Sequence, residues 1–271
     1  MFCKSGLVAA SLENKTDTVF VNTNIMKLLS VIIPVYNERK TIETLINRVL
    51  KVDIEKEIVI VDDFSTDGTR ELLESRCEQG SNLKVLYHER NKGKGFAIRT
   101  ALDHVKGDIV LIQDADLEYD PEEYYNLLDP IIKGKAKIVY GSRFYKVKRI
   151  AFIKNWIIRS LKKHPFEIVY IANFVCIQIL NLLVNVLYHA KITDEATCYK
   201  VFDRSVMDGI TLKCRRFEFC PEFTAKVLKK GYKIYEIPIS YAPRENLEGK
   251  KITWMDGLWA IYTLIKYRIV N

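Results

Sequence analysis

The sequence predicts an α/β domain with a mostly parallel central sheet, and three observations support this prediction. Short apolar segments rich in Val and Ile alternate with helix-like segments through the first half of the chain. Polar and acidic residues follow the apolar segments where each strand would end. Of the 271 residues, 48% are hydrophobic and 28% charged, which is typical of a folded domain with a sizeable core.

Four predicted strands alternate with three predicted helices up to residue 112. Each strand is a run of β-favouring apolar residues, and the helices carry apolar residues at helical spacing. The predicted strands are 28–35, 57–61, 83–87 and 109–112, and the predicted helices are 41–50, 69–77 and 96–105. Strands joined through helices form parallel sheets that are covered on both faces.

An acidic turn follows the fourth predicted strand. Asp114 and Asp116 lie one residue apart, and Glu118 follows two residues later. These carboxylates repel one another unless a positive group neutralises them, and a divalent cation that also holds a diphosphate is a common solution. The alternative is an acidic helix N-terminus, because Asp120 and Pro121 are typical of a helix cap and first turn. Both interpretations stay open at this point.

Other polar clusters are predicted to converge on the same crevice. Ligands of parallel sheets bind at the carboxyl ends of the strands, and residues 36–38 and 62–63 are expected there together with the acidic turn. The loop 91–95, with Lys92 and Lys94 flanking Gly93, follows the third strand. Neither a dinucleotide-binding fingerprint nor a Walker loop is present.

Five motifs, in this order, resemble those of the family 2 glycosyltransferases. They are SVIIPVYNE at 30–38, VDDFSTDGT at 61–69, NKGKG at 91–95, DAD at 114–116 and GSR at 141–143. Within that family the chain looks like the dolichol- and polyprenol-phosphate mannosyl- or glucosyltransferases, from about residue 28 to 245. The resemblance implies a GT-A fold, a Rossmann-like sandwich. It also implies an inverting transfer of a hexose from GDP-mannose or UDP-glucose to a polyprenyl or dolichyl phosphate.

The resemblance also assigns expected roles to individual residues. It implies a donor site of Pro34, Tyr36, Glu38, Asp62, Asp63, Lys94 and Asp114. It implies that Mg²⁺ or Mn²⁺ is held by Asp114, Asp116 and Glu118, and an acceptor phosphate by Arg143, Arg159 and Arg244. Asp116 and Arg143 are the expected catalytic residues. Two positions depart from the family pattern, since Glu118 replaces a glutamine often found there and Cys198 replaces the usual glycine.

The second half of the chain carries two segments typical of a membrane surface. Residues 144–165 contain seven Lys or Arg and no Asp or Glu, interleaved with Trp156 and aliphatic residues. Nucleic acid or plain solvent are the competing partners of this basic segment, but no nucleic-acid-binding module accompanies it. Residues 168–190 carry no formal charge and are long enough to span a bilayer. However, Gln178, Asn181 and Asn185 share one helical face, which favours an interfacial helix; a buried helix is the third possibility.

The expected organisation is one catalytic domain with attached interfacial helices. We expect a loose N-terminal extension (1–27), a nucleotide-sugar-binding half (28–145), interfacial helices (146–192), an acceptor-side half (193–250) and an amphipathic C-terminal helix (251–271). Translation could start at Met1 or Met26. The six cysteines form no CxxC pair, which indicates reduced thiols and no zinc site.

The charge of +8 favours an anionic partner. The expected partners are a nucleotide sugar, a polyprenyl phosphate and the cytoplasmic surface of a membrane, with a membrane protein as a further option and no nucleic acid. Two alternatives remain. A saccharide acceptor would need a general base, for which Asp194 and Glu195 are the candidates. A non-catalytic, nucleotide-sugar-binding membrane subunit is the other, whereas a nucleotidyltransferase would need a glycine-rich basic loop after the first strand.

Overall fold

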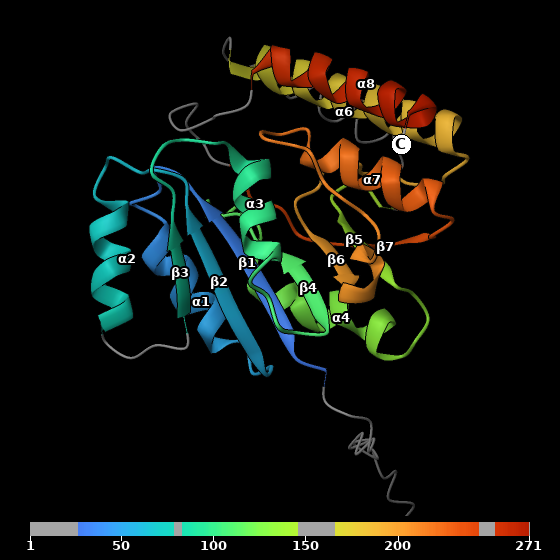
Figure 1. The fold of residues 1–271 in the computed structure, drawn as a ribbon. Helices are drawn as coiled ribbons and strands as arrows, with labels where there is room; N and C mark the ends of the chain where they lie inside the picture. The colour runs from blue at the N-terminus through green and yellow to red at the C-terminus, as the bar shows by residue number, and fades with distance from the viewer. Residues whose placement is uncertain (1–26, 79–82, 146–165, 244–252, 271) are drawn as a thin grey trace, which may run out of the picture.

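The computed structural model describes residues 27–78, 83–145, 166–243 and 253–270 (Figure 1). Seven strands form one sheet in the order β3-β2-β1-β4-β6-β5-β7. All neighbouring strands pair in parallel except β6, which is antiparallel to both β4 and β5. The predicted mostly parallel α/β sheet is therefore confirmed.

The element bounds agree closely with the sequence patterns. The strands are β1 (Leu29–Val35), β2 (Lys56–Asp62), β3 (Leu83–Tyr87), β4 (Ile109–Ile112), β5 (Ile138–Ser142), β6 (Lys200–Asp203) and β7 (Ile234–Pro238). The α-helices are α1 (Ile42–Lys51), α2 (Thr69–Glu78), α3 (Lys94–Leu102), α4 (Tyr124–Ile132), α6 (Phe166–Tyr188), α7 (Phe219–Lys229) and α8 (Trp254–Ile269). The 3₁₀ turns η1 (Pro121–Glu123) and η2 (Arg204–Met207) complete the order. Helix α3 ends three residues before the predicted Val105.

Two hydrophobic clusters hold the domain together. The larger lies around the sheet and includes fully buried side chains of β1, β2 and β4 such as Ile32, Ile60 and Leu111. These strands are apolar on both faces because helices cover both sides of a parallel sheet. The smaller cluster joins α6, α7 and α8 through residues such as Val184 and Leu264. It attaches a helical layer to the sheet domain.

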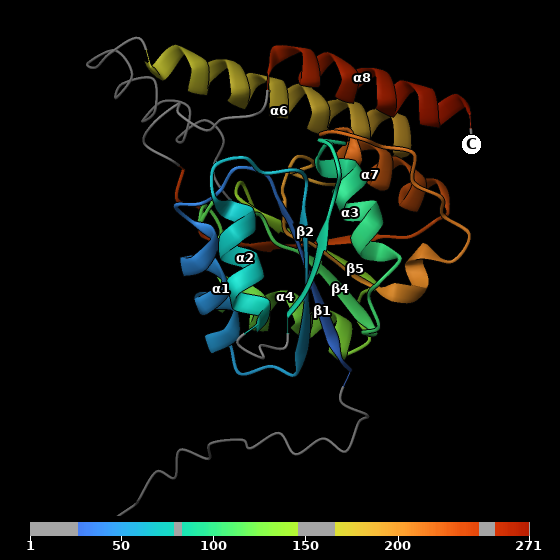
Figure 2. The same cartoon turned by 60° about the vertical axis from the view of Figure 1, so that its left-hand side comes forward.

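Helices α6 and α8 lie side by side across one end of the molecule (Figures 1 and 2). The hydroxyl of Tyr188 on α6 donates to the carbonyl of Leu264 on α8 at 2.6 Å. Gly257 lets the helices approach, since a Cβ there would lie 3.0 Å from the Sγ of Cys176. The carboxyl ends of the parallel strands point toward this same end of the molecule (Figure 1).

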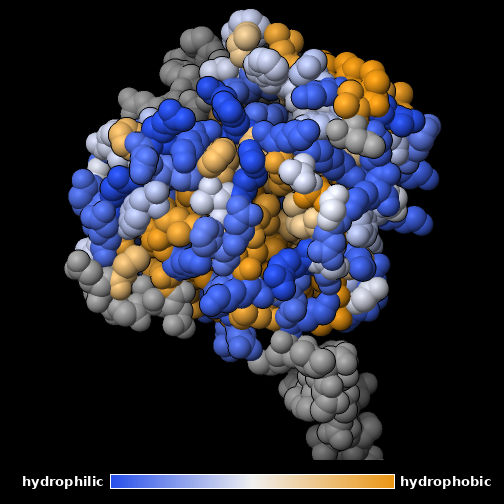
Figure 3. All heavy atoms as spheres, viewed as in Figure 1, coloured by the Kyte–Doolittle hydropathy of each residue, from blue (hydrophilic) through white to orange (hydrophobic). Residues whose placement is uncertain are grey.

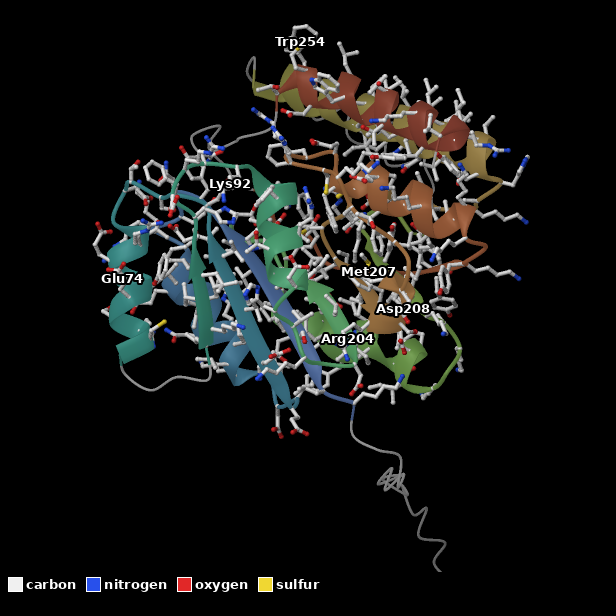
Figure 4. The ribbon with its side chains drawn as sticks, viewed as in Figure 1. Glu74, Lys92, Arg204, Met207, Asp208 and Trp254 are labelled. Carbon is white, nitrogen blue, oxygen red and sulfur yellow. The ribbon has the colours of Figure 1, made fainter. Side chains whose placement is uncertain are left out.

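The outward surface of these two helices is apolar. Twelve large hydrophobic side chains there are between 44% and 78% exposed: Val175, Ile179, Leu182, Val186, Trp254, Met255, Leu258, Trp259, Tyr262, Ile265, Ile269 and Val270. We refer to these residues as the apolar helix face, part of which is visible along α8 in Figure 3. Figure 4 shows Trp254 projecting away from the domain at the start of α8. No helix among the described residues is long and apolar enough to cross a membrane.

Helix α6 therefore has its polar stripe toward the domain and its apolar stripe outward, the reverse of an amphipathic helix that faces water. Asn181 is 2% exposed and Asn185 is half-buried, whereas Leu182 and Val186 face outward. The polar stripe recognised in the sequence packs on the domain, and the opposite apolar stripe is left uncovered by the described residues. Residues 146–165 of the predicted basic segment and the N-terminal residues 1–26 lie outside the described residues.

Candidate active site

The loops after β1 and β2 are bonded to each other at the carboxyl end of the sheet. The hydroxyl of Ser65 accepts from the Asn37 amide at 2.8 Å, and the Asn37 side-chain oxygen accepts from the Thr66 amide at 2.8 Å. The Glu38 amide donates to the hydroxyl of Thr69 at 3.0 Å. Asn37 has a φ of 50°, a left-handed conformation that asparagine tolerates better than most residues. These bonds shape the floor of the expected donor site.

The three donor residues predicted on β1 and its loop differ in accessibility. Pro34 is buried within β1 opposite Val61 of β2. Tyr36 is half-buried, and Glu38 is 8% exposed with one carboxylate oxygen accepting from the hydroxyl of Thr41 at 2.9 Å. Their contacts with a nucleotide stay a prediction, and of the three Tyr36 is the most accessible.

Asp62 and Asp63 are buried and bonded within the protein. Asp62 accepts from Arg70 Nε at 3.1 Å. Asp63 accepts from the backbone amides of Lys92 and Gly93 at 2.8 and 2.7 Å, and it lies 2.7 Å from Nδ1 of His88. Asp63 therefore anchors the loop 91–95, and its predicted contact with a donor would be additional to that role.

The glycines of the loop 91–95 allow two backbone segments to meet. Gly93 has a φ of +92°, and a Cβ on it would lie 2.5 Å from the carbonyl oxygen of Arg215. The amide of Gly95 donates to the Arg216 carbonyl at 2.9 Å, and a Cβ there would lie 2.7 Å from that oxygen. Only glycine fits both positions. The loop thereby joins the donor half of the domain to the segment before α7, and Lys94 at the start of α3 is held beside Asp114.

The acidic turn after β4 is partly neutralised by the protein itself. Lys94 Nζ lies 2.5 Å from Asp114 Oδ1, and Asp114 raises the pKa of Lys94 well above its usual value although burial opposes this. Asp116 accepts from the Glu118 amide at 3.2 Å, around Leu117 with its φ of 64°. Glu118 accepts from the hydroxyl of Tyr241 at 2.6 Å. The helix-cap interpretation holds as well, a few residues later, where the Asp120 side chain accepts from the Glu122 amide.

Two of the three predicted metal ligands, Asp114 and Asp116, have the donor chemistry that a divalent cation prefers. Mg²⁺ and Mn²⁺ prefer hard oxygen ligands, and Mg²⁺ is usually held by one or two carboxylates plus substrate phosphates. Asp114 and Asp116 supply such a pair. The described residues contain no group of three or more His, Cys, Asp or Glu side chains placed to hold a metal. Metal binding by Asp114, Asp116 and Glu118 stays a prediction, and the Glu118 carboxylate already accepts from the hydroxyl of Tyr241.

Arg143 follows β5 and is paired with a buried aspartate. Its Nε and Nη2 donate to Asp194 Oδ2 and Oδ1, both at 2.7 Å, and its backbone amide donates to Asp194 at 3.0 Å. The guanidinium carbon lies 5.1 Å from the centre of the Tyr241 ring and 5.4 Å from that of Phe144. This bidentate pair fixes the plane of the guanidinium, and none of the described residues bonds its Nη1. Arg159 and Arg244, the other predicted acceptor residues, lie outside the described residues.

Asp194 and Glu195 are both 0% exposed. Asp194 is occupied by Arg143, and burial raises the pKa of Glu195. Within the described part of the chain, Oε2 of Glu195 has no hydrogen-bond partner. Neither carboxylate is exposed to receive a proton from a saccharide hydroxyl, so the geometry disfavours both as general bases.

Sequence reasoning missed Tyr241, which joins the two parts of the site. Its hydroxyl bonds Glu118 in the acidic turn while its ring contacts Arg143. Tyr241 follows β7, and no motif in the sequence indicated a function for it. The sequence reasoning also missed β6. Its antiparallel insertion next to β4 places Cys198 against the donor half. There Cys198 Sγ lies 3.7 Å from Lys94 Nζ.

Residues 30–208 match the family described as glycosyl transferase family 2. The chain is 29% identical to the low-salt glycan biosynthesis hexosyltransferase Agl6 of Haloferax volcanii over 98% of this chain and 60% of that protein. It is 30% identical to the undecaprenyl-phosphate 4-deoxy-4-formamido-L-arabinose transferase of Pseudomonas fluorescens over 82% of this chain and 59% of that protein. It is 29% identical to the dolichol-phosphate mannosyltransferase of Pyrococcus furiosus over 88% of this chain and 64% of that protein. The chain therefore spans less than two thirds of the length of each of these relatives.

A solved structure with the same fold is glucosyl-3-phosphoglycerate synthase of Mycobacterium tuberculosis. The TM-score is 0.65 with 17% sequence identity, covering 90% of this chain and 80% of that one. That protein was crystallised with Mn²⁺, uridine diphosphate and phosphoglyceric acid. At this identity the likeness shows a shared GT-A architecture.

Proposed function

The chain belongs to glycosyl transferase family 2, and on this premise we propose that it transfers a hexose from a nucleotide sugar to a polyprenyl phosphate. GDP-mannose and UDP-glucose are the proposed donors. The similarity to proteins named for undecaprenyl and dolichol phosphate supports the acceptor class. The use of Mg²⁺ or Mn²⁺ is supported by the Asp114–Asp116 pair and by a solved neighbour that holds Mn²⁺ with uridine diphosphate.

The observation that carries this proposal is the Tyr241 bridge between the acidic turn and Arg143. The acidic turn suits a cation-bound donor diphosphate, and Arg143 suits an anionic acceptor. Tyr241 contacts both, since its hydroxyl bonds Glu118 at 2.6 Å and its ring lies 5.1 Å from the Arg143 guanidinium. A phosphate bound by Arg143 would therefore lie close to the acidic turn, where the donor diphosphate is proposed to bind.

The proposed reaction is a single displacement with inversion. An oxygen of the lipid phosphate forms a bond to the anomeric carbon, while the bond from that carbon to the nucleotide diphosphate breaks and the diphosphate leaves with the electron pair. A phosphate is ionised at neutral pH, so the reaction needs no strong general base, consistent with the burial of Asp194 and Glu195. Arg143 orients the phosphate, and a cation on Asp114 and Asp116 would stabilise the departing diphosphate.

The proposed location is the cytoplasmic surface of a membrane, with α6 and α8 in the interface. The apolar helix face gathers twelve exposed large hydrophobic side chains on two neighbouring helices, and exposed apolar surface of this kind is typical of a site that binds a protein or a membrane. Its orientation supports the proposal, because the carboxyl ends of the strands, where the donor would bind, point toward the same end of the molecule. A long-chain lipid phosphate could then reach Arg143 without leaving the membrane.

The test is a transfer assay on the full chain with a panel of labelled nucleotide sugars, Mn²⁺ and polyprenyl phosphate. We expect label in the organic phase with at least one donor, and a loss of at least a hundredfold in Asp116→Ala, because a metal-held carboxylate supports the leaving group. Label that stays in an aqueous saccharide product would favour the alternative acceptor. No turnover with any donor, or full activity in Asp116→Ala, would refute the proposal.

A further inference from the structure

The segment 192–195 before β6 is held by two asparagines of α6, Asn181 and Asn185. The side-chain amide of Asn181 donates to the carbonyl of Thr193 at 2.6 Å, and its oxygen accepts from the Glu195 amide at 2.7 Å. One turn later, Asn185 does the same to Ile192, donating to its carbonyl at 2.8 Å and accepting from its amide at 2.9 Å. Each side-chain amide thus pairs with the segment as a neighbouring strand would.

Glu236 of β7 holds the same segment from another direction. Its carboxylate accepts from the Thr193 amide at 2.8 Å, from the Asp194 amide at 3.0 Å and from the Thr193 hydroxyl at 3.0 Å. Glu236 is 8% exposed, and burial raises its pKa even though these bonds oppose the shift. A buried carboxylate that takes three donors from two adjacent residues leaves that backbone little freedom.

The residue at the centre of this arrangement is Asp194, which orients Arg143. The backbone of Asp194 is fixed by Glu236 at its own amide and by Asn181 on both sides, at Thr193 and Glu195. Its side chain then holds Arg143 through two bonds of 2.7 Å. A shift of this backbone by one hydrogen-bond length would rotate the guanidinium plane, on which recognition of a phosphate depends.

We propose that Asn181 and Glu236 are positioning residues for the acceptor phosphate, acting through Asp194 on Arg143. The proposal rests on the function given above and adds residues that neither touch substrate nor appear in the sequence motifs. It also gives α6 two separable tasks: the outward residues of the apolar helix face meet the lipid, whereas the inward asparagines set the arginine. Because one rigid helix carries both, the arginine is held at a fixed depth relative to the membrane surface.

The two tasks predict different responses to the same pair of acceptors. Asn181→Leu removes both bonds to the segment at nearly constant side-chain volume. We expect the acceptor KM to rise at least tenfold, both for a long-chain polyprenyl phosphate in vesicles and for a short-chain, water-soluble prenyl phosphate. The donor KM should stay within twofold, because the donor residues lie on β1 to β4 and their loops. Leu182→Ser should weaken activity on vesicles and leave the soluble acceptor unaffected.

Gln178→Leu is the matched control, since Gln178 lies on the same stripe of α6 and bonds no described residue. We expect its donor KM and its acceptor KM to match those of the unchanged chain. Glu236→Gln provides a second route if Asn181→Leu fails to fold, because it keeps one acceptor oxygen and loses the other. Its acceptor KM should rise about threefold to tenfold with the donor KM unchanged.

If Asn181→Leu and Glu236→Gln raise the donor KM as much as the acceptor KM, or raise neither, the positioning role is overturned. The transferase proposal is left intact by either result. The two failures are distinguishable from the unchanged chain alone. If that chain transfers no sugar to either acceptor, the proposed function fails and the positioning role fails with it.

Discussion

We predict that residues of the apolar helix face contribute to membrane binding, and we test this with one leucine from each helix. Leu182 on α6 and Leu258 on α8 are 62% and 52% exposed. Fully burying a leucine side chain is worth roughly 1.5–3 kcal/mol, so roughly half of this is available at each position. Leu182→Ser/Leu258→Ser should therefore weaken binding by roughly 1.5–3 kcal/mol, which is about 10- to 150-fold.

The assay is cosedimentation of the full chain with lipid vesicles, made with and without anionic lipid. Ile132→Ser is the control, because Ile132 is 56% exposed but lies at the end of α4, away from α6 and α8 in both views (Figures 1 and 2). We expect this control to bind vesicles like the unchanged chain.

Two results would refute the reasoning. If the double variant binds vesicles as well as Ile132→Ser does, the apolar helix face does not enter the lipid. If the double variant instead converts an oligomer to a monomer in analytical ultracentrifugation, with vesicle binding unaltered, the face is a protein interface. In that case a second copy or a membrane protein covers it.

Three further predictions follow from the site and its supports. Arg143→Lys should raise the acceptor KM at least tenfold with the donor KM unchanged in steady-state kinetics, because lysine cannot replace the bidentate contact with Asp194; an unchanged acceptor KM would exclude Arg143 from the acceptor site. Gly93→Ala should lower the free energy of unfolding in urea by more than Gly134→Ala. Both have positive φ, but a Cβ at 93 meets the Arg215 carbonyl whereas nothing lies within 4 Å of one at 134, so the reverse order would contradict the close approach. Glu57 should stabilise the fold above pH 4.5. Burial opposes the shift, but bonds from Ser30 and from the amides of Lys106 and Gly107 lower the pKa of Glu57 below 4.5. This stability is lost as the pH falls from about 4.5 through the folded-state pKa, and in Glu57→Gln the unfolding free energy should vary less over that window.

Short-range patterns in the sequence determined most of the first half of the fold. The strands at 83–87 and 109–112 were predicted to the residue, because a buried parallel strand is a continuous apolar run with polar ends. The acidic turn after β4 was located by the same reasoning, since strand ends and their charges are adjacent in the chain. Even Asn181 and Asn185 of α6 were recognised, with Gln178, as one polar stripe from helical spacing alone.

Only the tertiary structure decided how distant segments meet. Arg143 and Asp194 are 51 residues apart, and Glu118 and Tyr241 are 123 apart, so no local pattern reports either pair. Whether α6 turns its polar or its apolar stripe to the domain was likewise undetermined, because both stripes have the same helical period. In the structure the polar stripe faces the domain. The backbone groups of 192–195 need hydrogen-bond partners once they are buried, and Asn181 and Asn185 supply them.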